Sequence, residues 1–155
     1  MKSFLYTVEK TFPHSLGLSA CFRQHKARGS HCRFLHGYAL EVSLVVGSNA
    51  LNEKNWCYDF GSFKDIKRFL ETTFDHKLVV AFDDPEKVLL LSLADAGVAD
   101  VLVLANVGCE AFARYILESC IQNILSHSQT QDVYLLSVTV REHSGNSATY
   151  HNPNL

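Results

Sequence analysis

The segment Cys32-x-x-x-His36-Gly37 places a thiol and an imidazole four residues apart. Cysteine close to histidine is typical of a metal site or of an activated thiolate. Gly37 would let the backbone approach a ligand closely, although such a spacing also arises by chance. The surrounding stretch is rich in possible ligands, namely His14, Cys21, His25 and His31. We therefore look for chemistry in this segment first.

Asp75 and His76 are adjacent, at the end of a predicted helix and just before an apolar run. A carboxylate beside an imidazole favours the imidazolium form, so the two can form a proton relay. Adjacent Asp and His residues are also common as surface or capping residues. The dipeptide alone leaves both interpretations open.

Glu142 ends a strand in which Tyr134, Leu136, Val138 and Val140 alternate with more polar residues. The alternation predicts that all five side chains share one face. A carboxylate at the end of an apolar face needs a partner. One interpretation is an ion pair with Arg141 or a lysine. The other is an acceptor for two adjacent N–H donors, such as the edge of a guanine or pterin.

The remaining pattern predicts the elements that position these residues. Alternation from Tyr38 to Val46 predicts a half-buried strand, with His36 at the end of its inward face, and Trp56 to Tyr58 could form a short strand. Helical spacing predicts helices over 63–74, with Ser62 as cap, and over 109–124, and Pro85 starts another that runs towards Gly97. Short strands are predicted at 101–104 and 148–150. Strands, then helices, then strands indicate an α+β fold with a mostly antiparallel sheet.

Length and charge limit the class of protein. The 155 residues suit one domain, residues 1–155, and 14 Lys and Arg against 16 Asp and Glu give a net charge of −2. A nucleic-acid surface would need a basic excess, so we expect no nucleic-acid partner. No apolar run reaches the roughly 20 residues that cross a bilayer, so we expect no membrane contact. The absence of a signal peptide and five scattered cysteines predict a reducing, cytoplasmic location.

Five motifs occur in a defined order: Cys32-x-x-x-His36-Gly37, Asp59-Phe60-x-x-x-Lys64, Phe74-Asp75-His76, Gly108-Cys109-Glu110 and Val140-Arg141-Glu142. In this order, over about residues 18 to 150, the sequence resembles the 6-pyruvoyltetrahydropterin synthase and 6-carboxytetrahydropterin synthase family. The resemblance implies a tunnelling fold, in which a four-stranded antiparallel sheet has its helices on one face. It also implies a homo-oligomeric barrel, a trimer or a hexamer, with active sites between subunits.

The resemblance also implies roles for individual residues. Cys32 matches the family's catalytic cysteine, a general base, and Asp75 with His76 matches the pair that completes the proton relay. Glu142 matches the glutamate that anchors the pterin ring. Glu110 matches the glutamate of a Thr-x-Glu segment, which here reads Gly108-Cys109-Glu110, so the threonine hydroxyl is missing.

The sequence departs from the family at the metal. The family uses three histidines, two in a His-Gly-His run and one about eleven residues before the cysteine. Here the run is His36-Gly37-Tyr38, and ungapped counting puts Cys21 at the first position. We expect a zinc ion held by Cys21 and His36, since thiolate and imidazole are good zinc ligands. The third ligand stays open between Tyr38, His31 and His14. In the alternative, the metal is lost and His36 and Tyr38 are ordinary core or polar residues.

The activity implied by the resemblance is a lyase reaction on 7,8-dihydroneopterin triphosphate. The expected product is 6-carboxy-5,6,7,8-tetrahydropterin, which belongs to 7-deazaguanine (queuosine) precursor synthesis, because the Cys-x-x-x-His spacing and short chain resemble the carboxy enzymes. Lys26, Arg28 and Arg33 could bind the triphosphate, or form a solvated basic loop. The alternatives are 6-pyruvoyltetrahydropterin synthase activity and a non-catalytic pterin-binding relative with a degenerate metal site. A generic α+β binding module would leave the ordered motifs unexplained.

Overall fold

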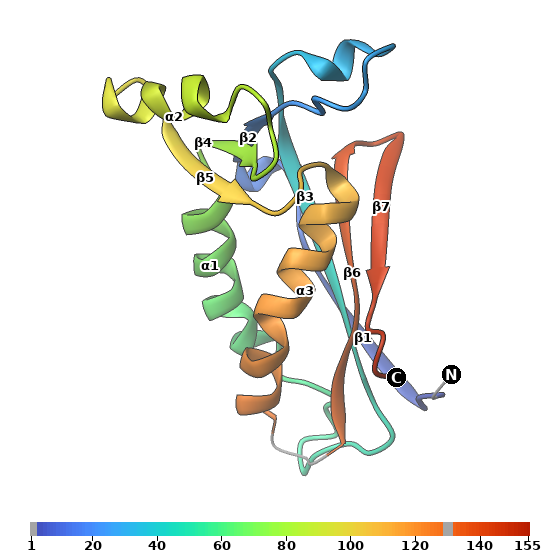
Figure 1. Cartoon of the computed structure of the whole chain (residues 1–155). Coiled ribbons are helices and arrows are strands. Elements are labelled where there is room, and N and C mark those ends of the chain that lie inside the picture. Colours follow the sequence, from blue (N-terminus) through green and yellow to red (C-terminus); the bar gives the residue numbers. More distant parts are fainter. Residues whose placement is uncertain (1–2, 129–131) are drawn as a thin grey trace.

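The computed structural model describes residues 3–128 and 132–155. Seven strands form one sheet in the order β5-β4-β2-β3-β6-β7, with β1 also paired to β3 (Figure 1). The strands are β1 (Tyr6–Phe12), β2 (Leu18–Phe22), β3 (His36–Ser48), β4 (Lys77–Ala81), β5 (Asp100–Leu104), β6 (Val133–His143) and β7 (Asn146–His151). The α-helices are α1 (Lys64–Phe74), α2 (Lys87–Asp95) and α3 (Cys109–Ser126), and short 3-10 turns are His14–Leu16, His31–Arg33 and Phe60–Phe63.

Strand β3 is the centre of the sheet. Its first half pairs with β2, its second half pairs with β1, and its other edge pairs with β6, all antiparallel. The predicted alternation is confirmed, because Leu40, Val42, Leu44 and Val46 are all fully buried on one side. His36 begins the strand, as its parity predicted.

The predicted four-stranded antiparallel sheet is wrong in its extent and its pairing. β2 pairs in parallel with β4, and β4 pairs in parallel with β5, so the sheet is mixed. The β4–β5 connection runs through α2, a crossover that parallel neighbours require. Sequence periodicity did not predict β1 or β2, whose inclusion extends the sheet beyond the expected hairpins.

The helices lie on both faces of the sheet, not on one. α1 and α3 bury their apolar stripes against the face that holds Leu40, Val79 and Phe22 (Figure 1). On the opposite face of β4, Leu90 of α2 packs with Leu78 and Val80. The predicted helices are confirmed. Their caps differ, since Asp59, and not Ser62, accepts a backbone hydrogen bond, from Gly61, at the turn before α1.

A register shift in β6 overturns part of the predicted strand face. Val46 lies opposite Leu135, whereas Val45 lies opposite Ser137, so the shift falls at Leu136. An extra residue in one strand moves later side chains to the other face. The buried apolar residues of β6 are therefore Val133 and Leu135 before the shift and Val138 and Val140 after it, not Tyr134 and Leu136. The predicted strand at 56–58 is also wrong, because Trp56 is irregular and Cys57 and Tyr58 form a bend.

The sheet face turned away from α1 and α3 carries polar pairs between neighbouring strands. Thr11 hydrogen-bonds to Ser43, and Thr139 to Thr149. Such pairs stabilise neighbouring strands without burying apolar surface. In residues 3–128 and 132–155 every helix is too short or too polar to span a bilayer.

Candidate functional site

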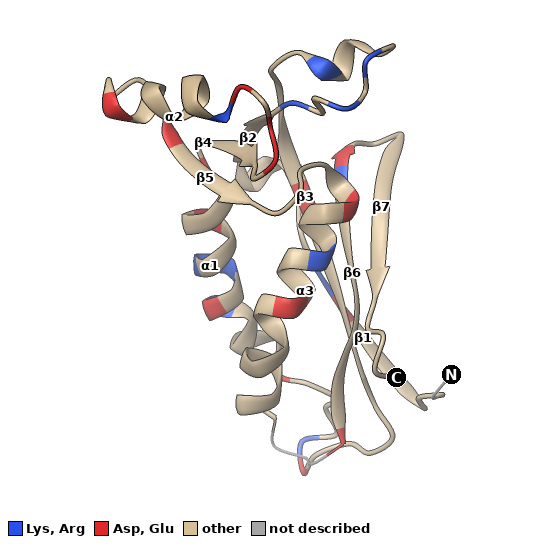
Figure 2. Cartoon of the chain, viewed as in Figure 1, with Lys and Arg blue, Asp and Glu red and all other residues tan. Residues whose placement is uncertain are grey.

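A cavity of about 360 Å³ lies where β6 ends, the β6–β7 turn begins and α3 starts. Its lining residues are Cys109, Glu110, Glu142, Gly145, Asn146, Ser147 and Ala148. Figure 2 shows acidic positions at the end of β6 and at the first turn of α3, and basic positions along the loop between β2 and β3. The cavity therefore has an acidic wall close to a loop that carries basic residues.

Glu142 is half-buried and forms part of this cavity wall. The Arg141 Nε lies 3.1 Å from Oε1 of Glu41, its neighbour across the β3–β6 pair, so Arg141 does not neutralise Glu142. Among the residues that the structure describes, no lysine or arginine forms an ion pair with Glu142. Its carboxylate thus remains available to accept hydrogen bonds from a ligand in the cavity.

The residues at the start of α3 hold Glu142 from the other side. Burial, followed by the negative charges of Glu142 and Glu110 and a hydrogen bond to the Glu142 side chain, raises the pKa of the Cys109 thiol to about 12. A thiol with so high a pKa stays protonated at neutral pH and can act as a donor. The Cys109 thiol therefore lies against the Glu142 carboxylate in its protonated form. From the sequence, Cys109 was only the middle residue of the Gly108-Cys109-Glu110 segment, in which Gly108 holds the position of the missing threonine, and the first residue of the helix predicted over 109–124.

Gln24 ties the loop that follows β2 to the start of α3. Its side-chain amide donates to the Val107 carbonyl at 2.5 Å, and its backbone N–H donates to the Cys32 carbonyl at 2.8 Å. Gly108 has φ +105°, and a Cβ there would lie 2.4 Å from Gln24 Nε2. The backbone conformation favours glycine here, and a Cβ would also displace the Gln24 amide from its present position. The contact places the Cys32 loop beside the α3 end of the cavity.

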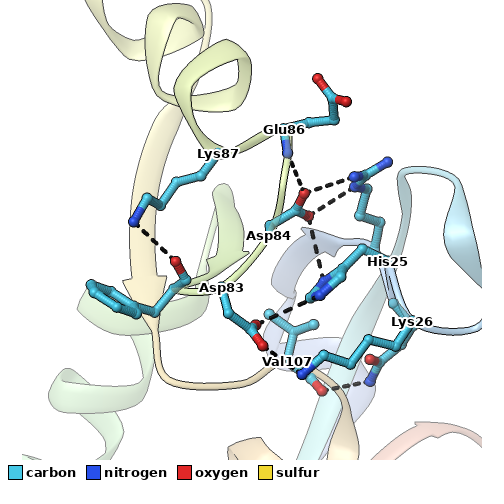
Figure 3. A network of polar contacts seen from close by, with 10 residues as sticks. His25, Lys26, Asp83, Asp84, Glu86, Lys87 and Val107 are labelled. Atoms are coloured by element: carbon cyan, nitrogen blue, oxygen red, sulfur yellow. Dashed lines mark hydrogen bonds and ion pairs between the residues drawn. The ribbon is translucent and has the colours of Figure 1, made fainter.

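A polar network fixes the same loop to the segment between β4 and α2 (Figure 3). Arg23 donates two hydrogen bonds to Asp84, at 2.8 and 2.7 Å. His25 lies 3.7 and 3.8 Å from Asp83 and Asp84, and the Lys26 Nζ lies 2.5 Å from Asp83. Figure 3 shows these side chains converging on the two aspartates.

The proposed triphosphate ligands differ in their surroundings. Lys26 is paired with Asp83, so its charge is already partly neutralised. The Arg33 guanidinium lies over the exposed ring of Phe34, 4.6 Å from its centroid. Arg28 lies in the same loop, between β2 and β3.

Asp75 and His76 lie together, as their sequence order requires. Asp75 Oδ1 is 2.7 Å from His76 Nδ1 and also accepts from the Ser19 backbone N–H at 3.4 Å. His76 has φ +56°, an uncommon conformation for a residue with a Cβ, and its side chain is 86% exposed. Residues held in such a conformation cluster at functional sites.

In the part of the chain that the structure describes, Cys32 lines neither the Glu142 cavity nor the cavity that His76 lines. His76 lines a cavity with Ser19, Cys21 and Leu35, on the sheet face that α2 covers. Cys32 is exposed in the turn His31–Arg33 and lies near Tyr38, which belongs to the other face. A relay between Cys32 and His76 would therefore have to join groups from two copies of the chain or follow a movement of the loop.

Cys21 and His36 do not face the same site. His36 lies opposite Phe22 in the β2–β3 ladder, and Cys21 lies opposite Gly37. Successive strand residues point to opposite faces, and Cys21 accordingly packs with Leu78 and Val80 on the α2 side. Burial raises the pKa of its thiol. The ungapped count thus assigned to Cys21 a position that the structure gives to Phe22.

The side chains beside His36 do not fit a metal ion. Phe22, His36 and Tyr38 form a triangle of rings, but Phe22 has no donor atom. Burial, followed by the charge of Glu142, raises the pKa of the Tyr38 phenol, which disfavours the phenolate. Across residues 3–128 and 132–155, no three His, Cys, Asp or Glu side chains are grouped to hold a metal, and His14 and His31 do not complete such a group. A sequence signal existed, because Leu18, Ala20 and Phe22 alternate inward along β2.

Comparison with known proteins matches residues 9–153 to the family model described as 6-pyruvoyl tetrahydropterin synthase. An uncharacterized protein, WS1659, from Wolinella succinogenes has a TM-score of 0.77 and 22% identity, with 97% of this chain and 99% of that chain covered. The 6-pyruvoyl tetrahydropterin synthase of Plasmodium vivax has a TM-score of 0.68 and 19% sequence identity, with 95% of this chain and 98% of that chain covered. The 6-pyruvoyl tetrahydropterin synthase of Caenorhabditis elegans has a TM-score of 0.61 and 19% sequence identity, with 95% of each chain covered. No curated protein matches the sequence. A family match over almost the whole length shows that the chain belongs to the 6-pyruvoyl tetrahydropterin synthase family.

Proposed function

We propose that the chain binds a pterin in the cavity at the end of β6 and acts on it as a lyase. The observation that carries this proposal is the half-buried carboxylate of Glu142 on the cavity wall, which has no lysine or arginine as ion-pair partner among the described residues. A carboxylate accepts two parallel hydrogen bonds from a planar pair of N–H donors, as it does from a guanidinium. A pterin presents such a pair, a ring N–H beside an exocyclic amine, and Glu110 lies on the same wall.

The proposed substrate is 7,8-dihydroneopterin triphosphate and the proposed product is 6-carboxy-5,6,7,8-tetrahydropterin, as in queuosine precursor synthesis. Cys32 would act as the base that removes a proton from the substrate side chain. His76, oriented by Asp75, would return a proton. Because His76 and Glu142 border different cavities in one chain, we propose a homo-oligomer, a trimer or hexamer, in which neighbouring copies complete the relay.

A 6-pyruvoyl product is the alternative within the same chemistry. A second candidate function is pterin binding without turnover. Phe22 favours this candidate, because it stands where the family's metal site would need a ligand. The retained Asp75–His76 pair, with its short hydrogen bond, favours a reaction, since a pure binding protein needs no proton relay.

The test is incubation of the purified chain with 7,8-dihydroneopterin triphosphate, with products identified by mass. A 6-carboxytetrahydropterin mass supports the proposed lyase, and a 6-pyruvoyl mass selects the alternative. Unchanged substrate that nevertheless binds to the protein would select the binding function. A chain that neither binds nor converts the pterin contradicts the proposal.

A further inference from the structure

We infer that this chain handles its pterin without a resident metal ion, because the aromatic ring of Phe22 occupies the third corner of the position where the family places its metal. The inference has two parts. The statement about pterin binding rests on the proposed function, whereas the statement that no metal is bound rests only on the geometry of Phe22, His36 and Tyr38.

The three rings have the spacing of a metal site without its chemistry. The ring centroids lie 4.9 Å apart for Phe22 and His36, 6.2 Å for Phe22 and Tyr38, and 5.6 Å for His36 and Tyr38. Three imidazoles bound to one tetrahedral zinc ion would place their centroids about 5 Å apart. The two distances to His36 are near this value and the Phe22–Tyr38 distance is longer, and Phe22 contributes only carbon. Catalytic zinc usually has three protein ligands, and this triangle contains one imidazole.

Phe22 is part of the hydrophobic core. Its side chain is 1% exposed and meets the Phe112 ring edge-on at 5.2 Å, and Phe112 in turn contacts Phe74 at 5.3 Å. These contacts continue the packing of α1 and α3 up to the floor of the site. A ring fixed on this side cannot make way for a ligand from another element without opening the core.

The polar groups near Phe22 do not supply the missing metal ligands. His36 Nδ1 lies 2.8 Å from the Phe34 carbonyl, which leaves one ring nitrogen for other contacts. The Cys21 thiol lies on the far face of β2. His36 and Tyr38 are half-exposed, so they can offer hydrogen bonds to a ligand directly. Hydrogen bonding and aromatic packing thus replace Lewis-acid chemistry at this position.

The experiment measures metal content and pterin affinity on the same sample. The wild-type chain, purified without chelator and then dialysed against zinc, should hold far less than one zinc per chain, and its pterin affinity should not change when a chelator is added. About one tightly held zinc per chain, together with loss of pterin affinity on chelation, would overturn the inference. Cys21→Ser identifies the ligand in that case, because any zinc bound through Cys21 would be lost in this variant.

A designed variant tests the geometry directly. Phe22→His with Tyr38→His adds two imidazoles to His36 and should take up about one zinc per chain, with a higher Tm in zinc. The same variant with His36→Ala is the matched control and should not. A folded double variant that takes up no zinc would contradict the claim that residues 22, 36 and 38 stand at the positions of three metal ligands. If the double variant does not fold, the wild-type zinc measurement alone decides. A wild-type chain that holds neither metal nor pterin would contradict the proposed function while it leaves the metal inference intact.

Discussion

The Arg23 guanidinium donates two hydrogen bonds to the Asp84 carboxylate, which is 1% exposed at the base of the Cys32 loop. Replacing Arg23 by leucine would leave this carboxylate buried without its main partner. Removal of one partner of a buried pair typically costs about 3 kcal/mol of unfolding free energy. We expect a loss of that size for Arg23→Leu, measured by urea unfolding.

Lys26→Ala is the control for this variant, because Lys26, on the same loop as Arg23, forms an exposed pair with Asp83. Exposed ion pairs contribute little, so the stability of this variant should match the wild type. The hydrogen bonds from Arg23 hold the pKa of Asp84 below its ordinary value. The ionised Asp84 therefore stabilises the fold at pH values above the ordinary pKa of aspartate, and this stabilisation is lost as the pH falls through the lowered pKa. Equal losses in both variants would show that the Arg23–Asp84 pair has no special weight.

Alkaline pH should destabilise the fold through buried thiols. Burial raises the pKa of Cys109 and of Cys120 to about 12, against 9.0 for an unperturbed thiol. Between these values the unfolded chain loses thiol protons while the folded chain keeps them. Each such thiol therefore lowers the free energy of unfolding by about 1.4 kcal/mol per pH unit between the two pKa values. Thermal unfolding across pH 8 to 11 should show the decline.

Cys120→Ala should reduce the steepness of this decline, because the variant removes one of the two thiols. Its loss of packing lowers the stability equally at every pH, so the slope separates the two effects. Cys32→Ala is the control, because Cys32 is exposed. An unchanged slope in Cys120→Ala would show that Cys120 ionises freely in the folded chain.

Cys32→Ala should abolish turnover and leave pterin affinity nearly intact. The Cys32 thiol lies in the exposed turn His31–Arg33 and carries the proposed base, whereas the Glu142 cavity is lined by other residues. Turnover is measured by product mass and affinity by pterin fluorescence. Cys57→Ala, at a buried cysteine that lines a different cavity, is the matched control. Full activity in Cys32→Ala would remove this residue from the mechanism.

Strong periodicity made the central strand and the three helices predictable. The alternation in β3 and the stripe in α3 follow the faces that the core buries. β1 and β2 were not predicted, and neither was their place in the sheet, because short strands take their stability from neighbours distant in sequence. The face of β6 was wrong because the register shift near Leu136 leaves no signature in the alternation.

The position of Glu142 in the candidate site could be predicted from the pattern of its own strand. Glu142 lies at the end of its strand beside Glu110, as its position suggested. The residue of β2 that shares the face of His36 was missed, because counting from Cys32 ignores the length of the loop. The alternation of Leu18, Ala20 and Phe22 pointed to Phe22, and its pairing with His36 shows this directly. The separation of His76 from Glu142 likewise depends on the sheet order, which the sequence does not display.

The most direct test of the account is the affinity of a pterin for Glu142→Gln, with Glu118→Gln as control. Glu118 is exposed on α3 and pairs with Arg114 away from the cavity. Loss of a charged hydrogen-bond partner typically costs about 1–3 kcal/mol. Calorimetric titration should show a loss of that size for Glu142→Gln and none for Glu118→Gln. Equal affinity in the wild type and both variants would contradict the claim that Glu142 binds the pterin.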